Sequence, residues 1–186
     1  MLVLGVDPGT HHTGWGLVHK VGTRLTHVAH GVISPPHARP LAERLVVIEA
    51  ELSRVVERHA PEIASVEALF FAKDAQAAAK LGHARGVALL VCARAGMPVF
   101  EYPPARVKRT VTGRGAADKL QVAQMIRALL RLSELPPADA ADALAIAVTH
   151  LSASPALTTK AATTAPHAAL LAAIAAGKGR KARATR

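Results

Sequence analysis

Cysteine and aromatic residues are scarce in this 186-residue chain, and long apolar runs are missing. Its single cysteine, Cys92, cannot form an internal disulfide or supply a cysteine-based zinc site, and a small core residue is its expected role. No apolar run reaches the roughly 20 residues that cross a bilayer. Met1 leads directly into an apolar strand rather than a signal segment. We therefore expect a cytoplasmic protein without disulfides or membrane spans.

Acidic residues are also few, since 13 Asp and Glu stand against 23 Lys and Arg, a formal net charge of +10. Residues 151–186 hold six basic residues and no acid, so the first 150 carry a net charge of only +4. The length favours one domain. We expect one folded domain over 1–150 and a disordered basic tail, rich in Ala, Ser and Thr, over 151–186. Such a tail would add salt-sensitive affinity for a polyanion such as DNA.

Short apolar segments and amphipathic periods alternate along the first 150 residues. Strands are predicted over 2–7, 14–20, 24–34, 63–67 and 97–102, and helices over 41–59, 73–94, 117–132 and 139–150. A polar loop that carries Lys108, Arg109 and Arg114 precedes the third helix, with room for a short helix before it. The order predicts an α/β fold whose mixed sheet opens with an antiparallel meander and continues with parallel strands.

Four acidic residues fall where these elements would bring them together. Asp7 and Glu67 each end a short apolar strand, and Asp139 and Asp142 share one face at the start of a helix. Clustered carboxylates raise one another's pKa values, and cations relieve that repulsion. Oxygen ligands suit Mg²⁺ or Mn²⁺, and two such ions can drive phosphodiester hydrolysis. We predict a DNA endonuclease with two Mg²⁺ ions per site, Mn²⁺ being the alternative, and Asp7 bridging both.

Each acid also has a structural explanation when it is considered alone. Asp139 follows two prolines and could cap a helix, and Asp142 could favour the helix dipole. Asp7 precedes Pro-Gly and could be a turn residue. Glu67 is harder to explain structurally, because an acid that closes a buried strand needs a partner.

Separated motifs run in order from about Leu2 to His150. They are Val6-Asp7-Pro8-Gly9-Thr10 with Thr13-Gly14, Val66-Glu67 followed by Phe70, Lys73 with Leu81-Gly82-His83-Ala84-Arg85-Gly86, Tyr102 to Lys108, Gly113 to Lys119, Ala138 to Ile146, and Thr149-His150. Together they resemble the RuvC family of bacterial Holliday-junction resolvases. The resemblance implies a ribonuclease-H-like fold, a five-stranded mixed sheet flanked by helices. It also implies a homodimer that nicks four-way DNA junctions in recombination and repair, using Mg²⁺ or Mn²⁺.

The resemblance also implies roles for individual residues. Asp7, Glu67, Asp139 and Asp142 would be the metal ligands, with Asp139 the least constrained because some relatives carry His there. Lys108 and Lys119 would assist cleavage by holding the scissile phosphate or balancing transition-state charge, although the residues alone suggest ordinary solvated lysines. Arg109 and Arg114 complete the basic residues that we expect to contact DNA.

Two adjacent phenylalanines, Phe70 and Phe71, follow Glu67 closely. The resemblance implies that Phe70 stacks on unpaired bases at the junction centre, an interaction of roughly 1–3 kcal/mol per base. The alternative is that it fills the core beneath its loop, the role expected of Phe71.

A junction with approximate twofold symmetry calls for two symmetric cuts, which a C2 homodimer supplies. We expect its interface on the helix 73–94, although the same face could instead cover the sheet of its own subunit. The interface residues would be Ala77, Leu81, Ala84, Ala88 and Val91. The resemblance further implies cooperation with the RuvA–RuvB branch-migration complex.

Other functions remain open on the residues alone. A ribonuclease-H-like enzyme could cut RNA–DNA hybrid instead. The turn Asp7-Pro-Gly-Thr10 also occurs in actin-like phosphate-binding ATPases, which need a second domain that 150 residues cannot provide. A nonenzymatic basic DNA-binding module would leave the four acids unexplained. His11 and His12 border the site and could touch phosphate, but solvated loop positions are the simpler expectation.

Overall fold

The computed structural model describes residues 1–68 and 75–153. Its strands are β1 (Leu2–Asp7), β2 (Thr13–Val21), β3 (Arg24–Ile33), β4 (Ile63–Glu67) and β5 (Val99–Tyr102). Its helices are α1 (Leu41–His59), α2 (Ala75–Arg94), α3 (Pro104–Thr112), α4 (Lys119–Leu130) and α5 (Ala138–Ser152). The sheet order is β3-β2-β1-β4-β5. β1, β2 and β3 pair antiparallel, while β1, β4 and β5 pair parallel, which confirms the predicted mixed sheet.

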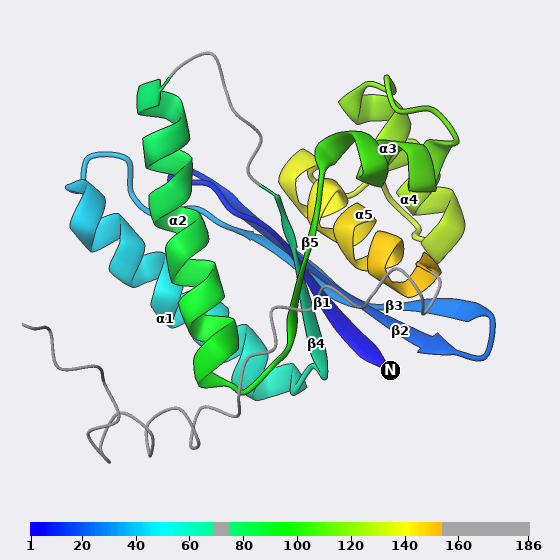
Figure 1. The fold of residues 1–186 in the computed structure, drawn as a ribbon, viewed down its shortest axis with the longest axis horizontal. Helices are drawn as coiled ribbons and strands as arrows, with labels where there is room; N and C mark the ends of the chain where they lie inside the picture. Colours follow the sequence, from blue (N-terminus) through cyan, green and yellow to red (C-terminus); the bar gives the residue numbers. More distant parts are fainter. Residues whose placement is uncertain (69–74, 154–186) are drawn as a thin grey trace, which may run out of the picture.

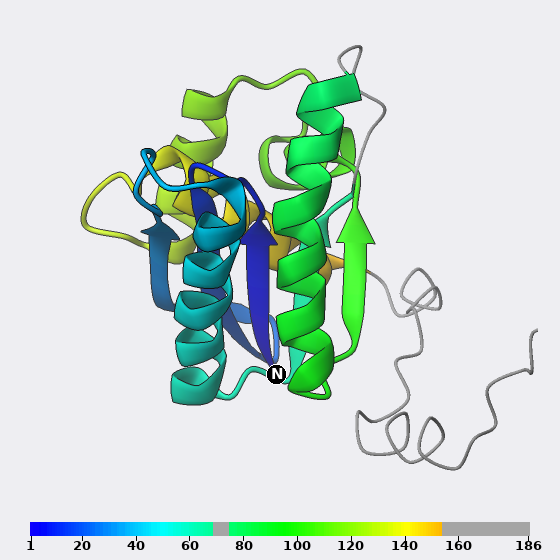
Figure 2. The same cartoon turned by 90° about the vertical axis from the view of Figure 1, so that its left-hand side faces the viewer.

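Helices cover both faces of the sheet. α1 and α2 lie on one face and α3, α4 and α5 on the other (Figures 1 and 2). Strand residues alternate between two cores: Leu4 and Val6 of β1 pack toward α1 and α2, while Val3 packs toward α3, α4 and α5. Within the described residues, no helix is both long and apolar enough to span a membrane.

α5 packs unusually close to the central strands. A β carbon added to Gly5 would lie 2.0 Å from the carbonyl oxygen of Ala143, and one added to Gly14 would lie 1.9 Å from that of Asp139. No side chain fits in either gap, so glycine lets the helix backbone rest directly on β1 and β2. This contact fixes where the first turn of α5 lies.

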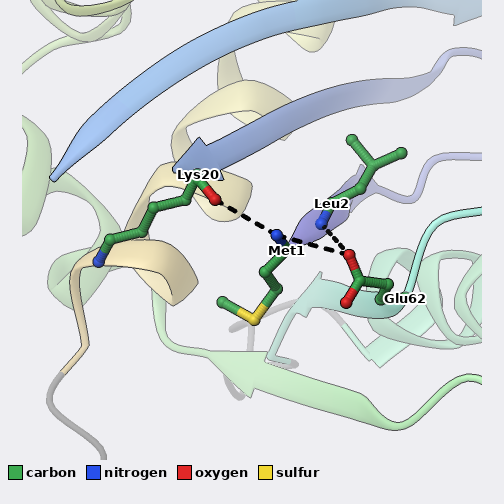
Figure 3. A network of polar contacts seen from close by, with 4 residues as sticks. All are labelled: Met1, Leu2, Lys20 and Glu62. Atoms are coloured by element: carbon green, nitrogen blue, oxygen red, sulfur yellow. Dashed lines mark hydrogen bonds and ion pairs between the residues drawn. The ribbon is translucent and has the colours of Figure 1, made fainter. Parts of the chain in front are cut away.

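The starts of β1 and β4 are tied together at the end of the sheet opposite Asp7 (Figure 3). The backbone nitrogen of Leu2 donates to Oε1 of Glu62 at 2.7 Å, which holds the pKa of that carboxyl below its usual value. The amino group of Met1 donates to the carbonyl oxygen of Lys20 at 3.2 Å. These contacts support the register that pairs Val6 with Val66.

Three sequence expectations differ from the structure. Lys108 and Arg109 lie on α3 rather than in a loop, because Pro104 begins that helix and Val107 and Val111, four residues apart, bury one face of it. Gly113, at φ 75°, ends α3 in the left-handed conformation.

The other two corrections concern α2 and α5. Three of the predicted interface residues, Ala84, Ala88 and Val91, are buried in the core beneath α2, so they cover their own sheet, which was the alternative expectation. Leu81 is half-buried and not part of that core. The side chain of Ala77 lies outside the described residues. Asp139 lies in the first turn of α5, whose N-cap is Pro137, so the helix-cap explanation for this acid is wrong.

Candidate active site

The two strand-end acids lie on adjacent strands at one edge of the sheet. β1 and β4 run parallel, and their last paired residues are Val6 and Val66. Asp7 and Glu67 follow directly, each ending its strand. Because neighbouring parallel strands end at the same edge, their carboxylates share one cavity of about 280 Å³.

α5 brings the other two acids to this edge. Its close contact with Gly14 places the backbone of Asp139 against β2. Asp142, one turn later, lines the same cavity as the strand-end acids. Asp139 is not part of the cavity lining, but its charge lies close enough to contribute to the raised pKa of Asp7.

Two lysines enter the same cavity from α3 and α4. Lys108 lines it from α3, and Lys119, the first residue of α4, pairs with Asp142 across 3.0 Å. A capping box fixes this start of α4: Asp118 Oδ1 accepts from the Gln121 backbone at 2.8 Å, and Gln121 Oε1 accepts from the Asp118 backbone at 3.2 Å. The cavity therefore combines carboxylates with two cationic side chains.

The charged side chains in this cavity shift one another's pKa values. Burial, together with the charges of Glu67, Asp142 and Asp139, raises the pKa of Asp7 to about 7, although the charge of Lys119 opposes the shift. Burial and the charge of Asp142 raise the pKa of Glu67. The hydrogen bond to Asp142 raises the pKa of Lys119 in turn. These acids carry more negative charge than the two lysines balance.

The loop after Asp7 is held by its own threonine. Thr13 Oγ1 donates to the carbonyl oxygen of Gly9 at 2.7 Å, and the Gly9 backbone nitrogen donates back to Thr13 Oγ1 at 3.3 Å. Thr13 is completely buried. The Asp-Pro-Gly-Thr turn therefore has a structural role in fixing the end of β1.

Two supporting contacts were not predicted from the sequence. Arg85 of α2 forms an ion pair with Glu101 and donates from Nε to the carbonyl oxygen of Glu67 at 3.4 Å, so it helps to hold the end of β4. Buried His150 and the Tyr102 hydroxyl form a hydrogen bond of 2.9 Å that joins α5 to β5. Arg85 and His150 both belong to the motifs described in the sequence, but only their tertiary contacts show these supporting roles.

The remaining predicted DNA contacts lie apart from the cavity. Arg109 lines a separate groove of about 580 Å³ on α3, together with Arg106. Arg114 is exposed between α3 and α4. Phe70 and Phe71 fall outside the described residues.

The donor set fits hard divalent cations. Carboxylate oxygens are the ligands that Mg²⁺ and Mn²⁺ prefer. Burial, and after it the charges of neighbouring carboxylates, raises the pKa values of Asp7 and Glu67, and a bound cation would stabilise their charged forms. Among residues 1–68 and 75–153, no three acidic, histidine or cysteine side chains are already close enough to hold an ion. Asp142 is paired with Lys119 in this arrangement.

The sheet is five-stranded and mixed, and acids end its neighbouring parallel strands β1 and β4. Further acids lie on α5, which packs across these strands. This arrangement defines a ribonuclease-H-like nuclease. A family model described as crossover junction endodeoxyribonuclease RuvC matches residues 3–150. The chain belongs to this family. It is therefore an endodeoxyribonuclease of a family that depends on divalent metal.

Individual relatives agree with the family match. A crossover junction endodeoxyribonuclease RuvC from Sorangium cellulosum is 64% identical over 154 residues, which cover 83% of this chain and 86% of the relative. Another from Methylorubrum populi is 53% identical, covering 81% and 79%. The structure of Thermus thermophilus RuvC in complex with Holliday junction substrate has a TM-score of 0.75 and 40% identity, covering 81% of this chain and 93% of that one.

Proposed function

We propose that this chain resolves four-way (Holliday) junctions by paired symmetric nicks during recombination and repair. The observation that carries the proposal is the single cavity that gathers Asp7, Glu67, Asp142, Lys108 and Lys119 at one edge of the sheet. The Thermus thermophilus RuvC that the chain resembles was captured with a Holliday junction substrate. The family match spans residues 3–150 and does not favour the hybrid-cutting or actin-like alternatives.

The acids are proposed to hold two Mg²⁺ ions, with Mn²⁺ as an alternative. Asp7 is the proposed bridging ligand because it ends the central strand and its pKa responds to all three other acids. Glu67, Asp139 and Asp142 complete the ligand set. Such ions supply the charge that activates water and stabilises the leaving oxygen in phosphodiester hydrolysis.

The two lysines are proposed to bind and orient the scissile phosphate. Lys119 balances the charge of Asp142 across 3.0 Å, and its side chain is 68% exposed, so it can reach an incoming phosphate. Lys108 would act from α3, where it lines the same cavity and its charge opposes the rise in the pKa of Glu67. Preorganised cations beside the reacting group stabilise negative charge as it develops.

Further contacts are proposed outside the cavity. Arg109 and Arg114 would bind DNA backbone on the α3 side, and Phe70 would stack on unpaired bases. A homodimer would present two sites to a symmetric substrate. Residues 1–150 would form the nuclease domain and 151–186 a basic tail, in a cytoplasmic protein that works with the RuvA–RuvB complex.

The proposal is tested by incubating the purified chain with a synthetic four-way junction, a matching linear duplex and an RNA–DNA hybrid. Each substrate is treated with Mg²⁺, with Mn²⁺ and with EDTA. Symmetric, ligatable nicks on the junction alone, lost in EDTA, are expected. Equal cutting of the hybrid would overturn junction resolution in favour of a ribonuclease.

A further inference from the structure

A cluster of basic side chains lies where the loop after Asp7 meets the segment that leads into α1, and we call His11, His37 and Arg44 the Arg44 cluster. Arg44 Nη1 donates to the carbonyl oxygen of Thr10 at 3.4 Å and lies 3.2 Å from His11 Nδ1. That nitrogen lies 3.2 Å from His37 Nδ1, and the two rings are 4.7 Å apart. Chain segments 26 residues apart thus meet at the edge of the sheet that bears the acids.

The charge of Arg44 is not balanced by a carboxylate. Three other arginines around α1 form ion pairs, namely Arg39 with Glu43, Arg54 with Glu51 and Arg94 with Glu49, whereas Arg58 near the end of this helix forms none among the described residues. Within residues 1–68 and 75–153, Arg44 has no acidic partner within 4 Å, and its buried Nε has no hydrogen-bond partner. A cationic guanidinium held against imidazole rings is stabilised by an anion.

The anion would reach the cluster from solvent, because the rings of His11 and His37 are exposed. His12 extends the cluster, with its ring 5.6 Å from that of His37 and its Nδ1 2.9 Å from Ser34 Oγ. Arginine and histidine donors together suit a phosphate.

We propose that the Arg44 cluster binds a backbone phosphate of the substrate strand outside the cleavage position. The inference rests on the proposed function, which brings a DNA strand to Asp7, four residues before His11. Phosphate contacts of this kind fix the register of the strand and carry no base information. The cluster therefore positions the scissile phosphate over the acids and takes no part in the chemistry.

The test uses the full chain and the variants His37→Gln and Arg44→Gln. The matched control is Arg54→Gln, which removes an exposed, glutamate-paired arginine from the same helix. The dissociation constant for a four-way junction is measured from 50 to 200 mM salt, with Ca²⁺ in place of Mg²⁺ to suppress cleavage. Each cluster variant should bind about 3–10-fold more weakly, and Arg44→Gln, which removes a permanent positive charge, should also reduce the salt slope by about one. The control should match wild type.

A second measurement locates the phosphate. Junctions carrying one neutral methylphosphonate at successive positions near the cut are bound by wild type and by His37→Gln. At one position outside the cut, the methylphosphonate should weaken binding by wild type. The same modification should have little further effect on His37→Gln, which already lacks the contact. Single-turnover cleavage of the unmodified junction in Mg²⁺ with subsaturating protein should fall in His37→Gln by about 3–10-fold, in step with the loss of affinity, as expected of a contact that binds and positions substrate.

The outcomes separate this inference from the proposed function. Wild-type affinity and salt slope in His37→Gln and Arg44→Gln would overturn the subsite. So would weakened binding by Arg44→Gln with an unchanged salt slope, which would mean that this substitution only loosens the loop. If wild type itself neither binds nor cuts the junction, the proposed function fails instead.

Discussion

Lys119 Nζ lies 3.0 Å from Asp142 Oδ2, so one of the proposed catalytic lysines is paired with one of the proposed metal ligands. The pair joins the start of α4 to the first turns of α5 across the acidic cavity. In the proposed function both partners have other roles, Lys119 with phosphate and Asp142 with metal. The ion pair would therefore have to open when substrate and cations bind.

Lys119→Gln should lower the single-turnover rate of junction cleavage about 10²-fold or more, because a charge that stabilises the transition state is lost. Its effect on stability should be small, since an exposed ion pair contributes about 0–1 kcal/mol. Cleavage assays and thermal unfolding check both parts. Arg94→Gln, which breaks the exposed pair with Glu49, is the control and should leave cleavage unchanged. A large fall in melting temperature with normal cleavage would show that Lys119 is only structural.

Gly14→Ala should destabilise the fold by about 1–3 kcal/mol, the usual cost of overpacking a core. The added methyl would meet the carbonyl oxygen of Asp139 and push α5 away from β2. Because α5 carries Asp139 and Asp142, cleavage should fall as well. Denaturant unfolding gives the free energy.

Gly86→Ala is the matched control, since nothing lies within 4 Å of a β carbon there. It should be neutral or stabilise α2 by up to about 1 kcal/mol. Equal stability for both variants would contradict the close packing of α5 on the sheet.

Lowering the pH should reduce the contribution of His150 to the free energy of unfolding. Burial lowers the pKa of this histidine below 6.5, so between 6.5 and its folded pKa the unfolded chain binds more protons than the folded one. The contribution of His150 to stability should thus be full above pH 6.5 and decrease as the pH falls from there. Asp7 and Glu67, whose pKa values are raised, act in the opposite direction, so the effect of His150 is measured as a difference between variants. His27 and His30, whose pKa values are also lowered, act in the same direction as His150. Unfolding is therefore measured in a His27→Gln, His30→Gln background.

In that background, the stabilisation lost in His150→Gln should be constant above pH 6.5 and become smaller as the pH falls below 6.5, because the contribution of His150 itself decreases there. A loss that stays constant below pH 6.5 would show that His150 does not titrate on unfolding as described.

Much of the site was predictable because its signals are local. Asp7 and Glu67 each end an apolar run, and such runs predict buried strands whose ends share an edge. α3 was harder, because only Val107 and Val111 mark its buried face among polar and basic residues. Local patterns establish elements and their ends.

Contacts between distant segments were beyond sequence reasoning. The close approach of α5 depends on pairing Gly14 with a helix that begins more than 120 residues later. The contacts of His11 with His37 and Arg44 depend in the same way on how the loop after β1 packs against α1 and the segment before it. Periodicity carries no information about such pairings, so only the fold reveals them.

The most direct test of the central claim compares wild type with Asp7→Asn on a synthetic four-way junction in Mg²⁺, with binding measured in parallel. Asn keeps the size of the side chain but removes the charge that the metal site needs. The account predicts symmetric, ligatable nicks from wild type, and from Asp7→Asn cleavage reduced by about 10³-fold or more with junction affinity retained. Cleavage by Asp7→Asn at the wild-type rate would contradict it.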